Sequence, residues 1–137
     1  MARVLIVPCG CRGRALAREL AAAGHTVRGT TRDRAKAEAI AAAGAEPYVG
    51  DPDRIGTLMD ALAGVSVVCW LMGSIALSPD RERMLFEKLV DTPVRGVVYE
   101  GASPQLARAA SRRWHIPLEV LEPGGAAKRA VDRMLGI

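Results

Sequence analysis

Apolar segments of strand length alternate with helix-like segments along the chain, and this alternation constrains the fold more than any other feature. The expected strands span residues 4–7, 26–31, 46–49, 65–72, 94–99 and 116–121. The expected helices span residues 16–23, 34–43, 52–63, 79–90, 104–114 and 126–135, the third beginning at Pro52 or Asp53. Helical crossovers place successive strands parallel, and their right-handedness favours the order 3-2-1-4-5-6. We therefore predict one α/β domain over residues 1–137, a doubly wound parallel sheet of six strands covered on both faces.

The turn after the first strand has the spacing of a phosphate-binding loop. Gly10 and Gly13 take the second and third places of the motif G-x-G-x-x-G, and Pro8 stands where the first glycine belongs. Glycines let the backbone approach a phosphate, and the start of the next helix presents unpaired N–H groups. Proline suits the turn but has no N–H to donate. We favour a phosphate loop of Gly10, Cys11, Arg12 and Gly13; the alternative is a turn that holds no ligand.

The end of the second strand indicates which dinucleotide would bind. In this architecture an acid there accepts from the ribose 2′-hydroxyl of NAD, whereas an arginine pairs with the 2′-phosphate of NADP. Neither Thr31 nor Arg32 is acidic, and Asp33 lies where the next helix begins and is typical of an N-cap. The pattern favours NADP over NAD, with Arg32 on the phosphate. The alternative is that Arg32 is a solvated surface residue.

Composition and charge exclude several classes of partner. The 19 Lys and Arg are scattered among 15 Asp and Glu, and a net charge of +4 spread in this way predicts no nucleic-acid binding. No leader-like segment and no apolar run of membrane length is seen, so we expect a cytoplasmic protein with no membrane partner. Cys9, Cys11 and Cys69 fit a reducing compartment. The Cys-x-Cys spacing of the first two predicts packing in the turn and no metal site.

Several segments beyond the first turn also match one protein family. They are RGRALARELAAAGHTV at 12–27, TRD at 31–33, GD at 50–51, ALAGVSVVCWLMG at 61–73 and the apolar strand with its Pro-Gly ending at 117–124. Together they resemble the short-chain dehydrogenase/reductase superfamily, most of all its atypical and extended branch of epimerase-like and NmrA-like proteins. The resemblance implies a Rossmann fold that binds NAD(P), with Asp51 at the adenine edge and Gly73 at the nicotinamide-side ribose. The chain looks like that family's cofactor-binding core, truncated before its substrate domain.

The chain departs from this family at the residues that do its chemistry. The family's working pair is Tyr-x-x-x-Lys on the helix after the fifth strand, where the lysine lowers the pKa of the tyrosine. Residues 103–116 contain neither a tyrosine nor a lysine. Ser103 matches the family's serine at the end of the fifth strand, but it also fits a turn or an N-cap. Catalytic residues therefore stay unassigned, and activity of the tyrosine–lysine type is not expected.

Two functions fit these observations. We favour an NADP(H)-binding protein of oxidoreductase or epimerase ancestry, with NAD as the alternative cofactor. The other function is a non-catalytic nucleotide or redox sensor, so the sequence leaves open whether the chain is an enzyme. Met84, Leu85, Phe86 and Leu89 are more apolar groups than one narrow helical stripe buries. We therefore also expect a homodimer or a partner protein.

Overall fold

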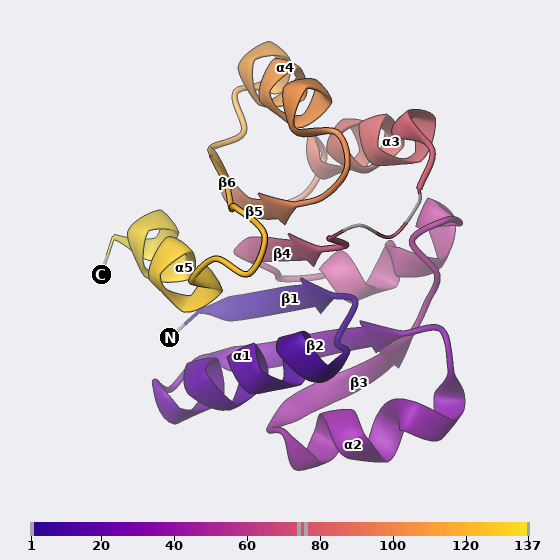
Figure 1. Ribbon diagram of the computed structural model, residues 1–137, viewed down its shortest axis with the longest axis vertical. Coiled ribbons are helices and arrows are strands. Elements are labelled where there is room, and N and C mark those ends of the chain that lie inside the picture. The colour runs from indigo at the N-terminus through magenta and orange to yellow at the C-terminus, as the bar shows by residue number, and fades with distance from the viewer. Residues whose placement is uncertain (1, 74, 76, 137) are drawn as a thin grey trace.

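The computed structural model describes residues 2–73, 75 and 77–136, and a parallel β-sheet runs through the middle of these residues (Figure 1). Its strand order is β3-β2-β1-β4-β5-β6, and all neighbouring strands are parallel. The strands are β1 (Arg3–Val7), β2 (Thr26–Thr31), β3 (Ala45–Val49), β4 (Val67–Leu71), β5 (Gly96–Glu100) and β6 (Leu118–Val120). The predicted α/β class and the predicted strand order are confirmed.

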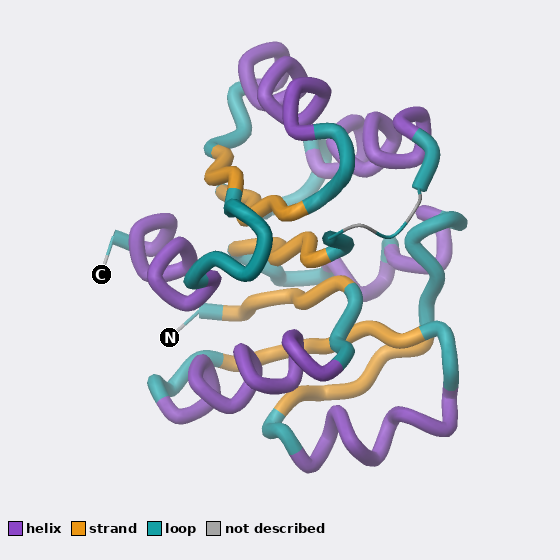
Figure 2. The backbone as a smooth tube through the Cα atoms, in the orientation of Figure 1, coloured by secondary structure: helices purple, strands orange, loops and turns teal. Residues whose placement is uncertain are grey.

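Helices cover both faces of this sheet (Figure 2). One face carries α1 (Cys11–Ala22), α2 (Ala37–Ala42) and α5 (Ala127–Leu135), and the short 3-10 helix η1 (Arg34–Lys36) leads into α2. The other face carries α3 (Pro79–Leu89), α4 (Pro104–Trp114) and two 3-10 helices, η2 (Ile55–Leu58) and η3 (Asp60–Leu62). Two apolar cores result, one on each side of the sheet.

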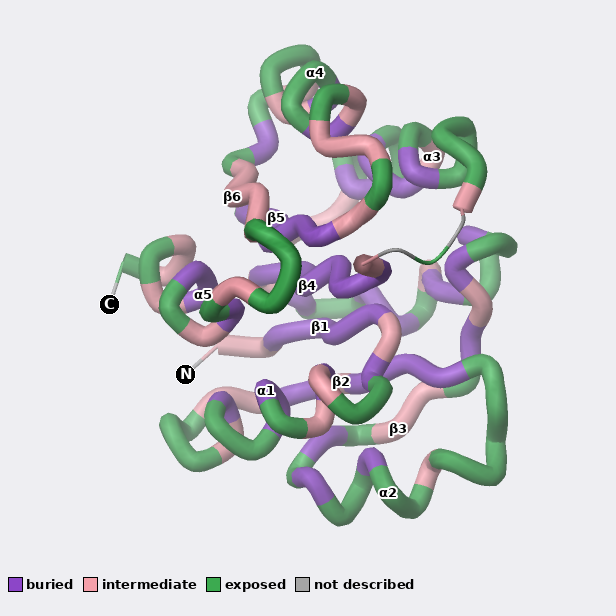
Figure 3. Tube along the Cα trace, in the orientation of Figure 1, coloured by how far each residue is buried: buried purple, intermediate pink, exposed green. Residues whose placement is uncertain are grey.

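The central strands are buried on both faces, as Figure 3 shows. Strand β4 alternates between the two cores: Val68 and Trp70 face the α3 side, whereas Val67 and Cys69 face the α1 side. Burial on both faces explains why this strand is an unbroken apolar run, which is typical of parallel sheets.

Several predicted boundaries were wrong, most clearly the helix expected over 52–63. That segment forms η2 and η3 instead, because side chains bond to the local backbone there. The Thr57 hydroxyl donates to the carbonyl of Arg54 at 2.7 Å and accepts the N–H of Asp51 at 2.8 Å. Such bonds compete with regular helix formation. Strands β4, β5 and β6 also begin later in the chain than predicted. The expected helix over 34–43 divides into η1 and α2.

The apolar patch expected on the helix after β4 is not exposed. Leu85, Phe86 and Leu89 are buried in the core, and Met84 packs against it. The exposed apolar side chain of this region is Val90 instead, just past the end of α3. Self-association therefore loses the argument that motivated it and stays a prediction. In the described part of the chain, no helix has the length and apolar character needed to cross a membrane.

A carboxyl group is buried in the α3 core. Glu82 is 1% exposed and lies against Tyr99 and Trp70, two of the largest buried side chains. One Glu82 oxygen and the Trp70 indole nitrogen are buried without a well-formed hydrogen bond to any described residue. Burial raises the pKa of Glu82, although the facing Tyr99 hydroxyl and Trp70 N–H oppose that shift. The folded protein therefore holds a proton on Glu82 that the unfolded chain releases at lower pH.

Because of this proton, we expect the free energy of unfolding to fall as the pH rises above the unfolded-chain pKa of Glu82. Above that pH the unfolded state binds fewer protons than the folded state. The fall should continue until the pH passes the raised folded-state pKa. Urea unfolding of the Glu82→Gln variant between pH 4.5 and 8 should lack this slope, since the amide does not titrate. Glu87→Gln, an exposed site on the same helix, should keep it. Equal slopes in wild type and Glu82→Gln would contradict the prediction.

Candidate functional site

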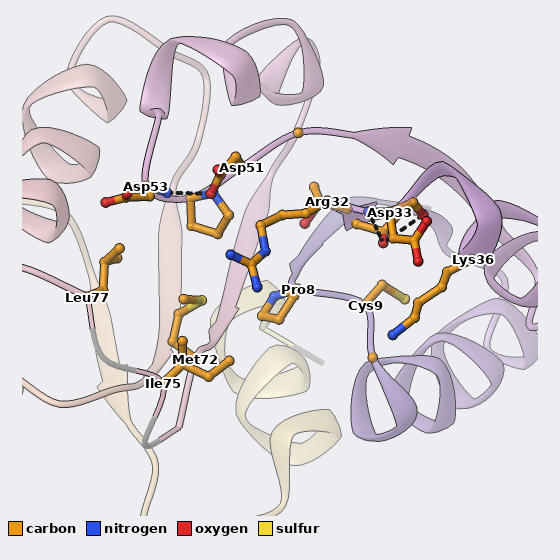
Figure 4. Close-up of a pocket in the computed structure, with 15 residues that line it drawn as sticks. Pro8, Cys9, Arg32, Asp33, Lys36, Asp51, Asp53, Met72, Ile75 and Leu77 are labelled. Carbon is orange, nitrogen blue, oxygen red and sulfur yellow. Dashed lines mark hydrogen bonds between the residues drawn. The ribbon is translucent and has the colours of Figure 1, made fainter.

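A pocket of about 590 Å³ opens at the carboxyl ends of β1, β2, β3 and β4 (Figure 4). In open α/β sheets ligands bind at this edge, because the loops that follow the strands converge there. Its volume lies in the range of small-molecule sites. The lining residues are Pro8, Cys9, Gly10, Thr30, Thr31, Arg32, Asp33, Lys36, Gly50, Asp51, Pro52, Asp53, Met72, Ile75 and Leu77.

The floor of the pocket is the turn between β1 and α1. The Cys9 N–H donates to the carbonyl of Thr30 at 2.8 Å, which ties this turn to the end of β2. Gly10 is the N-cap of α1, and no atom lies within 4 Å of the position that a Cβ would take there. The first turn of a helix has backbone N–H groups without intrahelical partners, and they attract anions. Open space therefore lies in front of a helix start that suits a phosphate.

Two glycines allow the layers beneath this turn to approach closely. A Cβ at Gly13 would lie 2.9 Å from the carbonyl oxygen of Pro8, so α1 could not pack this close to β1 with a larger residue. A Cβ at Gly29, in β2, would lie 2.6 Å from the sulfur of Cys9. Gly13 thus has the role of the third glycine of the motif, close packing of helix on strand. Gly29, which the motif does not include, makes room for the turn itself.

One wall of the pocket is cationic. Figure 4 shows the Arg32 guanidinium reaching into the pocket between Pro8 and Asp51, with Lys36 beside the Cys9 turn. Arg32 forms no ion pair with any residue that the structure describes. The neighbouring acid, Asp33, caps η1, where its Oδ1 accepts the N–H of Ala35 at 2.9 Å. One oxygen of this carboxylate is therefore used locally, as the N-cap prediction required, although Asp33 also lines the pocket.

The opposite wall is the turn after β3. Asp51 Oδ1 accepts the N–H of Asp53 at 2.9 Å, and the N–H of Asp51 donates to the Thr57 hydroxyl at 2.8 Å. These bonds hold the Asp51 carboxylate at the mouth of the pocket, across from Arg32. Met72, Ile75 and Leu77, from the segment after β4, add an apolar surface beside it. The pocket thus offers two cations, an apolar wall and three acids, Asp33, Asp51 and Asp53.

Of the residues predicted from the sequence, four line this pocket and four do not. Gly10, Thr31, Arg32 and Asp51 line it. The others lie close by: Cys11 is exposed on the first turn of α1, Gly13 is buried beneath the β1–α1 turn, Arg12 is paired with Glu100, and Gly73 donates its N–H to the carbonyl of Glu100 at 2.9 Å. Lys36 is the cationic lining residue that was not among the residues predicted from the sequence. Its signal was its place four residues after Arg32, and it is the last residue of η1, a 3-10 helix that the sequence did not predict.

The three thiols differ in their environment. Burial raises the pKa of Cys9 to about 11 and that of Cys69 to about 12, whereas Cys11 is exposed. The thiolate is the reactive form, so a buried thiol with a raised pKa is inert near neutral pH. The described residues contain no group of three or more His, Cys, Asp or Glu side chains placed to hold a metal ion.

We expect a single thiol per chain to react with a thiol reagent at pH 7.5 in the folded protein. Cys11 is that thiol, and the Cys11→Ser variant should lose the reaction. The assay is a spectrophotometric count with Ellman's reagent, repeated in urea, where all three thiols should react. Fast labelling of a second thiol without urea would show that the β1–α1 turn is more open than the structure has it.

A doubly wound sheet with a glycine turn and a pocket at its carboxyl edge defines a Rossmann-type nucleotide-binding domain. Residues 10–136 match the NAD(P)H-binding domain family, and the chain belongs to that family. The superfamily resemblance seen in the sequence is confirmed at this level. No curated protein matches the sequence significantly.

Solved structures with the same fold include reductases. Triphenylmethane reductase from Citrobacter sp., complexed with NADP(H), is 20% identical with a TM-score of 0.67, and the match covers 88% of this chain and 49% of that one. A short-chain dehydrogenase/reductase superfamily protein from Agrobacterium tumefaciens with bound NAD is 20% identical with a TM-score of 0.67. That match covers 88% of this chain and 48% of the other. A protein from Bacillus halodurans, assigned as an NAD-dependent epimerase/dehydratase, is 16% identical with a TM-score of 0.71. That match covers 89% of this chain and 70% of the other. The chain spans about half the length of the first two, and identities this low show the fold alone.

Proposed function

We propose that the chain binds NADP(H) in this pocket, with the adenosine 2′-phosphate against Arg32 and Lys36. The observation that supports this choice is the Arg32 guanidinium, which reaches into the pocket without an ion-pair partner among the described residues. A guanidinium donates two parallel bonds to a phosphate. The pyrophosphate would lie at Gly10 and the start of α1, and the adenine against Asp51.

The structural neighbours support the cofactor class without selecting its form. One of them holds NADP(H) and another holds NAD. The fold therefore accommodates either dinucleotide, and the choice between them depends on the residues after β2. At that place this chain has an arginine in the pocket and an aspartate whose carboxylate caps η1. An acid free to accept from a 2′-hydroxyl is the feature that NAD would require.

We further propose that catalysis of the tyrosine–lysine type does not occur. Tyr99, in β5, is the tyrosine that lies just before the helix on which the resembled family carries its working pair, and its side chain is fully buried. Its hydroxyl accepts the N–H of Ser103 at 2.9 Å, and burial together with Glu82 raises its pKa. A buried phenol with a raised pKa is a poor proton donor to a substrate in the pocket. This observation counts against tyrosine–lysine chemistry alone, so a reductase or epimerase that uses other residues and a non-catalytic nucleotide or redox sensor stay the two candidate functions.

A thermal-shift panel of NADPH, NADH, FAD and coenzyme A tests the proposed ligand. A compound that binds only the folded state stabilises it by RT ln(1 + L/Kd), where L is the free ligand concentration, so at equal concentrations the tightest ligand gives the largest rise in melting temperature. We expect NADPH to give the largest shift. A larger shift with FAD or coenzyme A would assign the pocket to another nucleotide, and no shift with any of the four would contradict the proposal.

A further inference from the structure

A cluster of polar groups joins the start of α1 to the far half of the sheet. Arg12, in the first turn of α1, forms an ion pair with Glu100, the last residue of β5. A second nitrogen of the same guanidinium donates to the carbonyl of Gly125 at 2.8 Å. The other Glu100 oxygen accepts the N–H of Gly124 at 2.8 Å. We call these four residues the latch.

The latch is a built structure with little access to water. The Glu100 side chain is 8% exposed, and both of its oxygens are used within the latch. Arg12 is about one third exposed. Removing one member of such a pair would leave a buried charge without compensation, so the two charges hold each other in place. The turn at Gly124 and Gly125, which leads into α5, is held by both of them.

The position of the latch follows from the strand order. Helix α1 follows β1, whereas Glu100 ends β5, and β4 lies between those two strands. The latch therefore passes over the end of β4, at the point where the strand order reverses. A doubly wound sheet binds a dinucleotide across this point, with one nucleotide on each half of the sheet. The latch occupies the half formed by β4, β5 and β6.

The pocket stops where the latch begins. Its lining comes from the ends of β1, β2 and β3 and from the segment after β4, and no residue of the latch lines it. The open part of the site therefore includes the place that would receive the adenosine nucleotide, at Gly10, Arg32 and Asp51, and it extends to the apolar segment after β4. Beyond that segment, the crevice at the ends of β5 and β6 is closed by an ion pair and two hydrogen bonds to backbone groups.

We propose that the latch excludes the nicotinamide half of the ligand, so that this chain recognises a 2′-phosphoadenosine group and leaves the nicotinamide outside. This inference rests on the proposed function and specifies which part of the ligand that function uses. A free 2′-phosphoadenosine nucleotide should then bind as tightly as the whole dinucleotide. Such a site binds the adenosine end of its ligand and does not position a nicotinamide ring for hydride transfer.

Calorimetric titration of the wild-type chain with NADP⁺ and with 2′,5′-ADP tests the inference without any substitution. A closed latch predicts dissociation constants within about threefold of each other. NADP⁺ binding about tenfold tighter or more would overturn the latch and leave the proposed function intact. Failure of both ligands to bind would overturn the proposed function and this inference with it.

The double variant Arg12→Gln/Glu100→Gln removes both charges together, so neither is left buried without its partner. If the latch closes the crevice, NADP⁺ should bind this variant at least about tenfold tighter than 2′,5′-ADP. Glu119→Gln is the matched control, since it breaks the Arg133–Glu119 pair that joins α5 to β6 away from the crevice. The ratio of its dissociation constants for NADP⁺ and 2′,5′-ADP should equal the wild-type ratio. A folded double variant with the wild-type ratio would overturn the latch, and the wild-type titration decides the matter if the variant does not fold.

Discussion

Replacing Gly29 with alanine is expected to destabilise the protein by about 3 kcal/mol, at the upper end of the usual cost of overpacking a core. The added Cβ would lie 2.6 Å from the sulfur and 2.7 Å from the Cβ of Cys9. Cys9 cannot move away easily, because its N–H is bonded to Thr30 and its side chain is buried. Urea unfolding, followed by circular dichroism, measures the loss.

A double-mutant cycle ties this loss to the contact with Cys9. Cys9→Gly removes both clashing atoms, so the pair Cys9→Gly/Gly29→Ala should be more stable than the sum of the two single losses by at least about 1 kcal/mol. Gly10→Ala is the control, because a Cβ there meets nothing within 4 Å, and it should change stability by less than about 0.5 kcal/mol. Additive losses in the cycle would mean that Gly29 is required for another reason.

Replacing Arg32 with alanine is expected to remove most of the preference for NADPH over NADH. Charge-assisted bonds to a phosphate contribute roughly 1.5–3 kcal/mol, which corresponds to about tenfold to a hundredfold in affinity. The variant should lose that factor toward NADPH and keep its NADH affinity, because only the 2′-phosphate meets the guanidinium. Titration of both dinucleotides into wild type and variant measures the two changes.

Arg34→Ala is the matched control for this experiment. Arg34 is an exposed arginine two residues further along, and it does not line the pocket. Its removal takes away the same charge from the same region, so an electrostatic effect of net charge alone would appear in both variants. Equal losses in Arg32→Ala and Arg34→Ala would assign the preference to the general field and not to a direct contact.

The fold could be predicted because its strands and helices are each marked by a local sequence pattern. Apolar runs such as 65–72 and glycine-ended helices recur along the chain, and the handedness of crossovers then leaves few topologies. Element ends were less predictable, since they depend on side chains that bond to nearby backbone. Thr57 and Asp51, which turn the expected helix over 52–63 into 3-10 helices, are an example.

The candidate site was predictable where it follows strand ends and unpredictable where distant residues meet. Four predicted residues lie at or just after the end of a strand, so the parallel sheet brings them to one edge: Gly10, Thr31, Arg32 and Asp51. The pairing of Arg12 with Glu100 joins positions 88 residues apart, and nothing in either local sequence indicates it. The structure pairs the Arg12 side chain with Glu100, and the place of Arg12 in the phosphate loop stays a prediction.

The central claim is that the pocket binds a dinucleotide through its 2′-phosphate. Calorimetric titration of the wild-type chain with NADPH and NADH, at low and at high salt, tests it most directly. We predict one site per chain and NADPH binding about tenfold to a hundredfold tighter at low salt, with a smaller ratio at high salt because the exposed arginine is screened. Equal affinities for NADPH and NADH at low salt would contradict the account and make Arg32 a solvated surface charge.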